Sequence, residues 1–206
     1  MGAPVRQLPP ADTADVGGCA QGAGAVLAGI IALMMWSDGN GFGAAAMAAL
    51  AAVLAVKFFQ RRRAHDAALA QLRAAQSTEI ARYHAMNPRE FEHAIAFLCQ
   101  RDGCQHVKVV GGAGDLGADV LALAPDGRRI VIQCKRYGPT TKVGSPDLQR
   151  FGGTCYSVHG AHVAAVVTTS VFTRPAAQYG AHQGIRLLDG TALASWATRT
   201  GPAPWM

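Results

Sequence analysis

The stretch ADVLALAPDGRRIVIQCK, residues 118–135, predicts two β-strands joined by a tight turn. Apolar and β-branched residues predominate in residues 118–124 and again in residues 129–135. Between them, the tripeptide PDG at 125–127 is typical of a hairpin turn, because glycine tolerates the backbone conformation that such turns require. We therefore expect a β-hairpin here.

Three polar side chains are predicted to meet at one end of this hairpin. Gln133 and Lys135 point to the same face of their strand, because side chains repeat every two residues, and the turn brings Asp119 to the same sheet end. Metal-assisted hydrolysis of a phosphodiester needs such a set: oxygen ligands for a hard cation and a positive group near the attacking water. The plainer alternative is a structural ion pair between Asp119 and Lys135.

Signals on both sides of the hairpin predict a mixed α/β fold. Asn87 can cap a helix, Pro88 suits its first turn, and Glu90 lies where a capping-box carboxylate reaches back. That helix is expected to end near Asp102. The other expected elements are strands over residues 105–110, 162–170 and 185–188 and helices over residues 145–159, 173–182 and 191–197. This order predicts a mixed sheet flanked by helices.

Charge is distributed unevenly along the 206 residues, of which 50% are apolar and 16% charged. From Gln60 onward the chain has 17 of the 19 basic and 10 of the 13 acidic residues, a formal charge of +7. A basic portion suits an anionic partner such as nucleic acid or an anionic membrane surface, although many domains are modestly basic without one. The five cysteines form no set with zinc-site spacing.

Two apolar runs, residues 19–36 and 42–59, predict a transmembrane helical hairpin. Each is just long enough to span a bilayer as a helix, and the polar break SDGNG at 37–41 separates them. Two alternatives stay open. The first run could be a cleaved signal peptide, or the pair could be a soluble helical hairpin, although neither run shows a polar face.

The arginines at residues 61–63 determine the expected orientation, because basic residues next to a span stay on the cytoplasmic side. The soluble part is then expected at the cytoplasmic face of a bacterial inner membrane. The expected segments are an N-terminal tail (1–18), two transmembrane helices (19–60), a helical connector (61–86), a soluble domain (87–198) and a C-terminal tail (199–206).

Five short motifs of the soluble domain occur in a familiar order. They are FE at 91–92, GDLGADV at 114–120, VIQCKRY at 131–137, VTTSVFT at 167–173 and LDG at 188–190. Together they resemble the Mrr-like restriction endonucleases of the PD-(D/E)xK nuclease superfamily. The resemblance implies a restriction-endonuclease-like α/β fold, cleavage of double-stranded DNA, and Mg²⁺ or Mn²⁺ as cofactor.

The resemblance also implies roles for individual residues. Asp119 matches the acidic metal ligand, Gln133 the second ligand, and Lys135 the lysine that positions or activates the attacking water. Cys134 would contribute its backbone carbonyl, and Glu92 matches an acidic position that often completes the site. Most of the superfamily has Asp or Glu where this chain has Gln133. A neutral ligand predicts a more weakly held metal.

Other polar residues near these motifs have competing interpretations. Glu92 can equally be a solvated helix residue, and Asp115 is expected to stabilise the glycine-rich turn rather than bind metal. Thr168 and Thr169 are candidates for contact with the DNA backbone. A phosphate-binding rim, or else an ordinary solvated basic surface, is expected from Arg128, Arg129, Arg136, Lys142 and Arg150.

The expected function is therefore a membrane-anchored DNA endonuclease that restricts foreign or modified DNA, as type IV restriction enzymes do. Two alternatives remain: a catalytically silent DNA-binding or tethering module with the nuclease fold, and a structure-specific nuclease for DNA repair. A homodimer would supply the two active sites that cutting both strands commonly needs.

Overall fold

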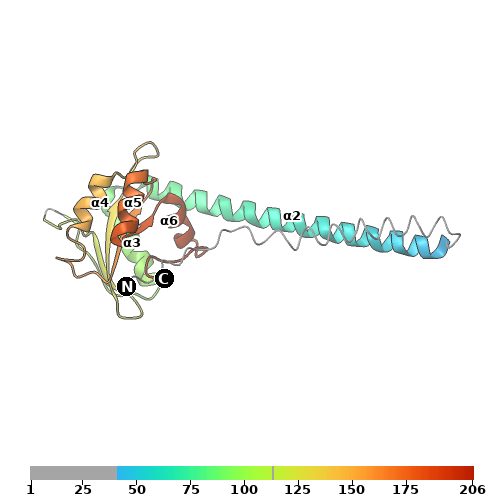
Figure 1. Ribbon diagram of the computed structural model, residues 1–206, viewed down its shortest axis with the longest axis horizontal. Helices are drawn as coiled ribbons and strands as arrows, with labels where there is room; N and C mark the ends of the chain where they lie inside the picture. The colour runs from blue at the N-terminus through green and yellow to red at the C-terminus, as the bar shows by residue number, and fades with distance from the viewer. Residues whose placement is uncertain (1–40, 113) are drawn as a thin grey trace. The chain divides into compact units, whose positions relative to one another are not determined.

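The computed structural model describes residues 41–112 and 114–206. The helices are α2 (Gly41–Ala85), α3 (Pro88–Arg101), α4 (Ser145–Gly152), α5 (Arg174–Gln183) and α6 (Gly190–Ala197). The strands are β1 (Gln105–Val109), β2 (Val120–Leu123), β3 (Arg129–Lys135), β4 (Val163–Thr168) and β5 (Arg186–Leu188). The predicted mixed α/β fold, with a sheet flanked by helices, is confirmed (Figure 1).

The five strands form one sheet in the order β1-β2-β3-β4-β5. β1, β2 and β3 pair antiparallel, whereas β3, β4 and β5 pair parallel. In the predicted hairpin, Val120 of β2 pairs with Ile132 of β3, and at the carboxyl end of β3 Lys135 pairs with Thr168 of β4. The end of β3 that contains the polar motif therefore lies between an antiparallel and a parallel neighbour.

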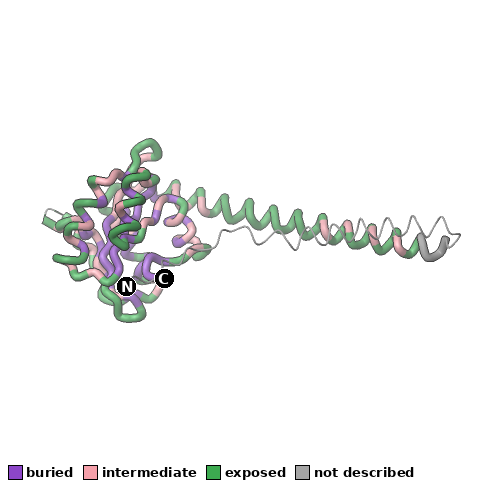
Figure 2. Tube along the Cα trace, in the orientation of Figure 1, coloured by how far each residue is buried: buried purple, intermediate pink, exposed green. Residues whose placement is uncertain are grey.

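Alternate residues of the central strands face two separate cores. Ile130 and Ile132 of β3 pack with residues of α3 and α6, whereas Val131 packs with residues of α4 and α5. All three side chains are fully buried. Figure 2 shows that burial is concentrated on the sheet. Because helices cover both faces, β3 and β4 are apolar along most of their length.

Local sequence signals delimit α3, the helix that contains Glu92. Asn87 accepts a hydrogen bond from the Glu90 backbone N–H, and the Glu90 carboxylate accepts one from the Asn87 N–H, as the predicted capping box requires. Past the other end, Gly103 adopts a left-handed backbone conformation with φ of +88°, and its N–H donates to the Gln100 carbonyl. Both ends of α3 are thus determined by local residues in the helix and directly beside it.

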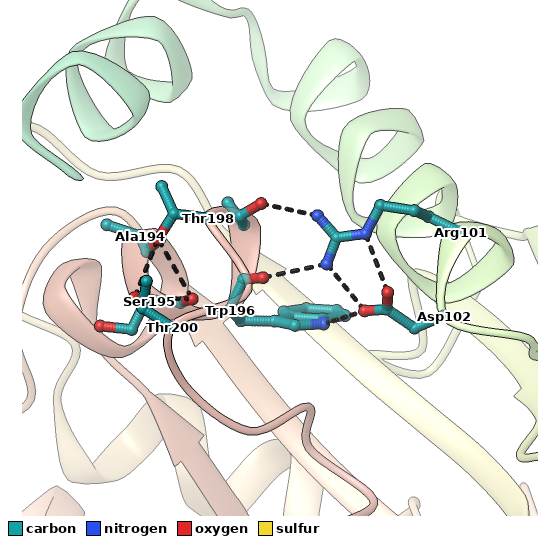
Figure 3. A network of polar contacts seen from close by, with 8 residues as sticks. Arg101, Asp102, Ala194, Ser195, Trp196, Thr198 and Thr200 are labelled. Carbon is teal, nitrogen blue, oxygen red and sulfur yellow. Dashed lines mark hydrogen bonds and ion pairs between the residues drawn. The ribbon is translucent and has the colours of Figure 1, made fainter. Parts of the chain in front are cut away.

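A polar network joins the end of α3 to α6 (Figure 3). The Arg101 guanidinium contacts both carboxylate oxygens of Asp102, at 2.9 and 2.8 Å, and donates to the carbonyls of Trp196 and Ala197. The Trp196 indole N–H donates to Asp102 at 2.7 Å. Hydrogen bonds from Arg101 hold the pKa of Asp102 below its usual value. Each charged group in this network therefore has several partners.

The predicted transmembrane hairpin is not supported. Its first run, residues 19–36, lies outside the described residues. Its second run, residues 42–59, forms part of α2, which continues through the predicted connector to Ala85 because neither glycine nor proline occurs between Gly43 and Pro88. Over residues 41–112 and 114–206, no helix combines the length and the apolar character that a membrane span needs.

Two segments that the sequence assigns to flanking regions contribute to the core. Tyr83, near the end of α2, is buried and packs edge-on against Phe91. Trp205, from the predicted C-terminal tail, is also buried and packs edge-on against Trp196. Each aromatic contact joins one of these segments to a helix of the domain and adds buried hydrophobic area to its core.

Candidate active site

The open end of the β2–β3 hairpin brings the three predicted residues together. The Asp119 backbone N–H donates to the Ile132 carbonyl at 2.9 Å, which continues the strand pairing past β2. One carboxylate oxygen of Asp119, Oδ2, accepts the Cys134 backbone N–H at 2.6 Å. This bond holds the carboxylate against the backbone of β3 between Gln133 and Lys135.

Gln133 is a buried amide with an incomplete set of hydrogen bonds. The residue is 6% exposed, and its Oε1 has no hydrogen-bond partner among the described residues. Leaving a buried acceptor unpaired costs about 1–3 kcal/mol, and most buried polar atoms are paired. A Cβ at Gly117 would lie 3.2 Å from Gln133 Nε2, so glycine there leaves room for the amide. The unpaired oxygen is available to a ligand.

Burial raises the pKa of Asp119 to about 6. The charges of Glu92 and Asp115 also raise it, whereas the Cys134 N–H and the charge of Lys135 lower it. The ionised carboxylate is therefore poorly solvated and has other negative charges nearby. A cation bound next to it would stabilise its charged form.

Lys135 lies between two carboxylates. Its side chain is 23% exposed, and its Nζ is 3.8 Å from Asp147 Oδ1 at the start of α4. Its charge also lowers the pKa of Asp119, which places Asp119 within electrostatic range. The sequence indicated Asp147 only as part of a helix start, so its place beside Lys135 was missed.

Asp115 and Glu92 add negative charge near Asp119 in different ways. Asp115 accepts the backbone N–H groups of Gly112 and Gly117, each at 2.8 Å, and so stabilises the glycine-rich turn as predicted. Glu92 of α3 is half-buried against Gly111, where a Cβ would lie 2.6 Å from its Oε2. Burial raises the pKa of Glu92. Its carboxylate thus faces this turn rather than open solvent.

The two threonines at the end of β4 support the backbone of the site. Thr168 donates its hydroxyl to the Lys135 carbonyl at 2.7 Å. The Thr169 hydroxyl accepts the Tyr137 N–H at 3.0 Å and donates to the Tyr137 carbonyl at 2.7 Å. Both threonines are buried. The predicted contact with the DNA backbone is therefore wrong, because these hydroxyls are used to fix the chain that follows Lys135.

The basic residues predicted to form a rim do not lie together. Arg129 begins β3 and Lys135 ends it, so about 20 Å separates them at roughly 3.3 Å per residue. Arg128 lies at the same far end, where it pairs with Asp126 at 2.7 Å. The other three lie in or beyond the loop that follows β3: Arg136, Lys142 and Arg150. Only those three remain candidates for a rim at this site.

The donor atoms at this sheet end fit a hard divalent cation. Asp119 offers a carboxylate, and Gln133 offers an amide oxygen that is buried and unpaired among the described residues. In the part of the chain that the structure describes, no three His, Cys, Asp or Glu side chains are grouped to hold a metal ion. The predicted ligand set therefore depends on the neutral Gln133.

Residues 83–197 match the protein family Mrr_cat, described as restriction endonuclease. The match covers more than half of the chain, so the chain belongs to this family, and the domain is a restriction-endonuclease-like nuclease domain. The resemblance inferred from the motifs is confirmed to this extent. No match was found among the curated proteins.

Solved structures show more distant likenesses. The chain is 20% identical to the MspJI restriction endonuclease in complex with a 27-mer oligonucleotide, with a TM-score of 0.44 over 61% of this chain and 31% of that one. It is 19% identical to the DNA modification-dependent restriction endonuclease AspBHI, with a TM-score of 0.47 over 64% of this chain and 36% of that one. It is 24% identical to a protein of unknown function, with a TM-score of 0.44 over 50% of this chain and 58% of that one. The chain spans less than two thirds of the length of each of these proteins.

Proposed function

We propose that the chain is a divalent-metal-dependent endonuclease that hydrolyses phosphodiester bonds of double-stranded DNA. One observation carries the proposal: in a member of the restriction endonuclease family, Gln133 keeps a buried oxygen with no partner among the described residues, and the next residue, Cys134, donates its N–H to the Asp119 carboxylate. Stability alone does not favour an unpaired acceptor next to a poorly solvated acid, whereas binding a cation gives both a partner.

Each residue has a distinct part in this proposal. Asp119 and Gln133 would hold Mg²⁺ or Mn²⁺, with Glu92 adding negative charge from α3. The cation would act as a Lewis acid toward the scissile phosphate. Lys135 would orient the attacking water by hydrogen bonding and stabilise the negative charge that develops on the phosphate oxygens. The Cys134 N–H keeps the Asp119 carboxylate in place.

Plasmid cleavage by the full chain tests the proposal. We expect nicking and linearisation of supercoiled DNA with Mg²⁺ or Mn²⁺ and none with a chelator. Asp119→Ala and Lys135→Ala should each lower the rate by about 100-fold or more, since each removes a group that acts in the transition state. Asp126→Ala, at the far end of the hairpin, is the matched control and should cleave normally. Cleavage that persists in both site variants would contradict the proposed roles.

The biological role that we propose is restriction of foreign or modified DNA, as in type IV systems, and it is supported by the family alone. Methylated and unmethylated plasmids compared side by side would test it. Faster cleavage of modified DNA is expected, whereas a preference for branched over linear substrates would favour a repair nuclease instead. A homodimer is proposed because two sites would cut both strands; light scattering with and without DNA would measure it.

We also propose that residues 19–60 anchor the domain at the cytoplasmic face of the inner membrane. The support is the apolar sequence of this segment and the exposure of several large apolar side chains on α2. Those side chains are Leu50, Val53, Leu54, Val56 and Phe59. Fractionation of cells that produce the full chain should find it in membranes after a high-salt wash. Recovery in the soluble fraction would refute the anchor without affecting the nuclease assignment.

A further inference from the structure

We propose that Asp147 is a positioning residue for Lys135, holding its ammonium group away from the metal ligands and toward the position of the substrate. The inference rests on the proposed function, because Lys135 matters here only if the site hydrolyses DNA. It begins from one ion pair: Lys135 Nζ lies 3.8 Å from Asp147 Oδ1, with the two side chains 23% and 13% exposed. Both partners are thus largely withdrawn from solvent.

Asp147 is itself held firmly. Its Oδ2 accepts the Tyr137 hydroxyl and the Gly144 backbone N–H, both at 3.4 Å, while its Oδ1 accepts Arg150 at 2.8 Å. The helix that contains it is anchored by Leu148 and Phe151, both fully buried. A carboxylate with donors on both oxygens and a buried helix behind it has little freedom to follow a moving lysine. The lysine must therefore adapt to Asp147.

The loop between the two partners is also fixed. Val143 donates its N–H to the Val171 carbonyl at 2.9 Å and accepts the Thr173 N–H at 3.0 Å, so it pairs with the segment that follows β4. The Thr169 hydroxyl, from the same segment, accepts the Tyr137 N–H and donates to the Tyr137 carbonyl. The start of α4 and the end of β3 are therefore tied to one common segment. The separation of Asp147 from Lys135 follows from these ties.

Electrostatics explains why a second acid is useful. Lysine has a flexible four-carbon stem and a point charge, so its ammonium group moves to the strongest nearby negative charge. Asp119, the proposed metal ligand, also lies within electrostatic range of Lys135 and would still attract it without Asp147. An ammonium group paired with Asp119 would compete with the cation and leave its position beside the phosphate. Asp147 balances that attraction from α4. Arg150 donates to the same oxygen at 2.8 Å and helps to hold it in place, while its 76% exposed side chain leaves its charge largely screened by solvent.

Steady-state cleavage kinetics of the full chain test this inference. Asp147→Asn keeps the size of the side chain and removes its charge. We expect kcat to fall by about 10-fold, because small misplacement of a catalytic group is costly, while KM for DNA stays within about twofold. The Mg²⁺ concentration that gives half-maximal rate should rise by about threefold, as Lys135 competes for Asp119. Asp147→Glu should recover part of kcat, and Asp126→Asn should match the wild type.

A second variant distinguishes a loss of Lys135 positioning from a defect in folding. Tyr137→Phe removes one donor to Asp147 and leaves both charges, so a fall in kcat of about two- to threefold with unchanged thermal unfolding is expected. If the wild type cleaves DNA and Asp147→Asn has the same kcat and Mg²⁺ requirement, only this inference is overturned. A rise in KM alone would also overturn it, in favour of a role in DNA binding. If the wild type does not cleave with either metal, the proposed function and this inference fall together.

Discussion

The domain contains two partly buried polar clusters of similar composition and opposite character. In the first, Arg101, Asp102 and Trp196 satisfy one another through hydrogen bonds of 2.6–2.9 Å that include backbone carbonyls (Figure 3). In the second, Asp119 has a pKa raised by burial, and Gln133 keeps an oxygen that is unpaired among the described residues. Both clusters combine an acid, a base and a third polar side chain.

The contrast separates a polar group that serves the fold from one that is arranged for a ligand. In the Arg101–Asp102 cluster, hydrogen bonding lowers the pKa of the acid, so folding favours its charged form. In the Asp119–Gln133 cluster, burial raises the pKa of the acid, so folding disfavours the charged form. The first network stabilises the folded chain as it stands. The second would be stabilised by a bound cation, and the proposed metal-dependent nuclease activity is based on this difference.

The largest effect on stability is expected at the satisfied cluster. Asp102→Ala would leave the Arg101 guanidinium without its carboxylate and the Trp196 N–H without an acceptor. We expect the free energy of unfolding to fall by about 2–4 kcal/mol, since breaking a largely buried ion pair leaves the remaining charge buried without a partner. Urea denaturation would measure it, with exposed Asp126→Ala as the matched control. A loss no greater than that of the control would remove the distinction between the clusters.

A smaller effect, of opposite sign, is expected for Asp119→Asn in metal-free protein. The folded pKa of Asp119, about 6, lies above its ordinary value of 3.8, so ionisation costs stability as the pH rises from about 4 to above 6. The variant should therefore be more stable than the wild type at pH 7.5, by about 1–2 kcal/mol after allowance for solvent screening, and equal to it near pH 4. Denaturation at both pH values checks this. Equal stability at pH 7.5 would contradict the burial argument.

The smallest expected effect concerns the strength of metal binding. Gln133→Glu would replace a neutral ligand by a charged one and add attraction for the cation. At pH 8 the Mg²⁺ concentration for half-maximal cleavage should fall by about 10-fold, equivalent to about 1.4 kcal/mol. Gln133→Met, of similar length but without the amide, should raise it. An unchanged Mg²⁺ requirement in both variants would exclude Gln133 as a ligand.

The sequence predicted the elements whose signals are local. β3 begins and ends where its apolar run and the PDG turn indicate, and the capping box at Asn87 forms as expected. The two-residue repeat of side chains along β3, together with one tight turn, was enough to place Asp119, Gln133 and Lys135 at the same end of the sheet.

Features that depend on packing between distant segments were missed. The position of Asp147 depends on a loop that is held by the segment after β4, and the burial of Trp205 depends on packing against distant residues such as Trp196. The hydroxyls of Thr168 and Thr169 turn inward because their hydrogen-bond partners, near the end of β3, are brought to them by the sheet. α4 ends at Gly152 rather than near residue 159, since Gly153 follows and the chain then turns.

Thermal unfolding of the full chain in the presence of divalent metal tests the contrast between the clusters most directly. At pH 7.5, about 10 mM Mn²⁺ or Mg²⁺ should raise Tm of the wild type by a few degrees, because a ligand that binds the folded state stabilises it. The same rise should occur in Asp102→Asn from a lower starting Tm and should be absent in Asp119→Asn. An equal rise in wild type and Asp119→Asn, or no rise in the wild type, would contradict a metal site at the end of β3.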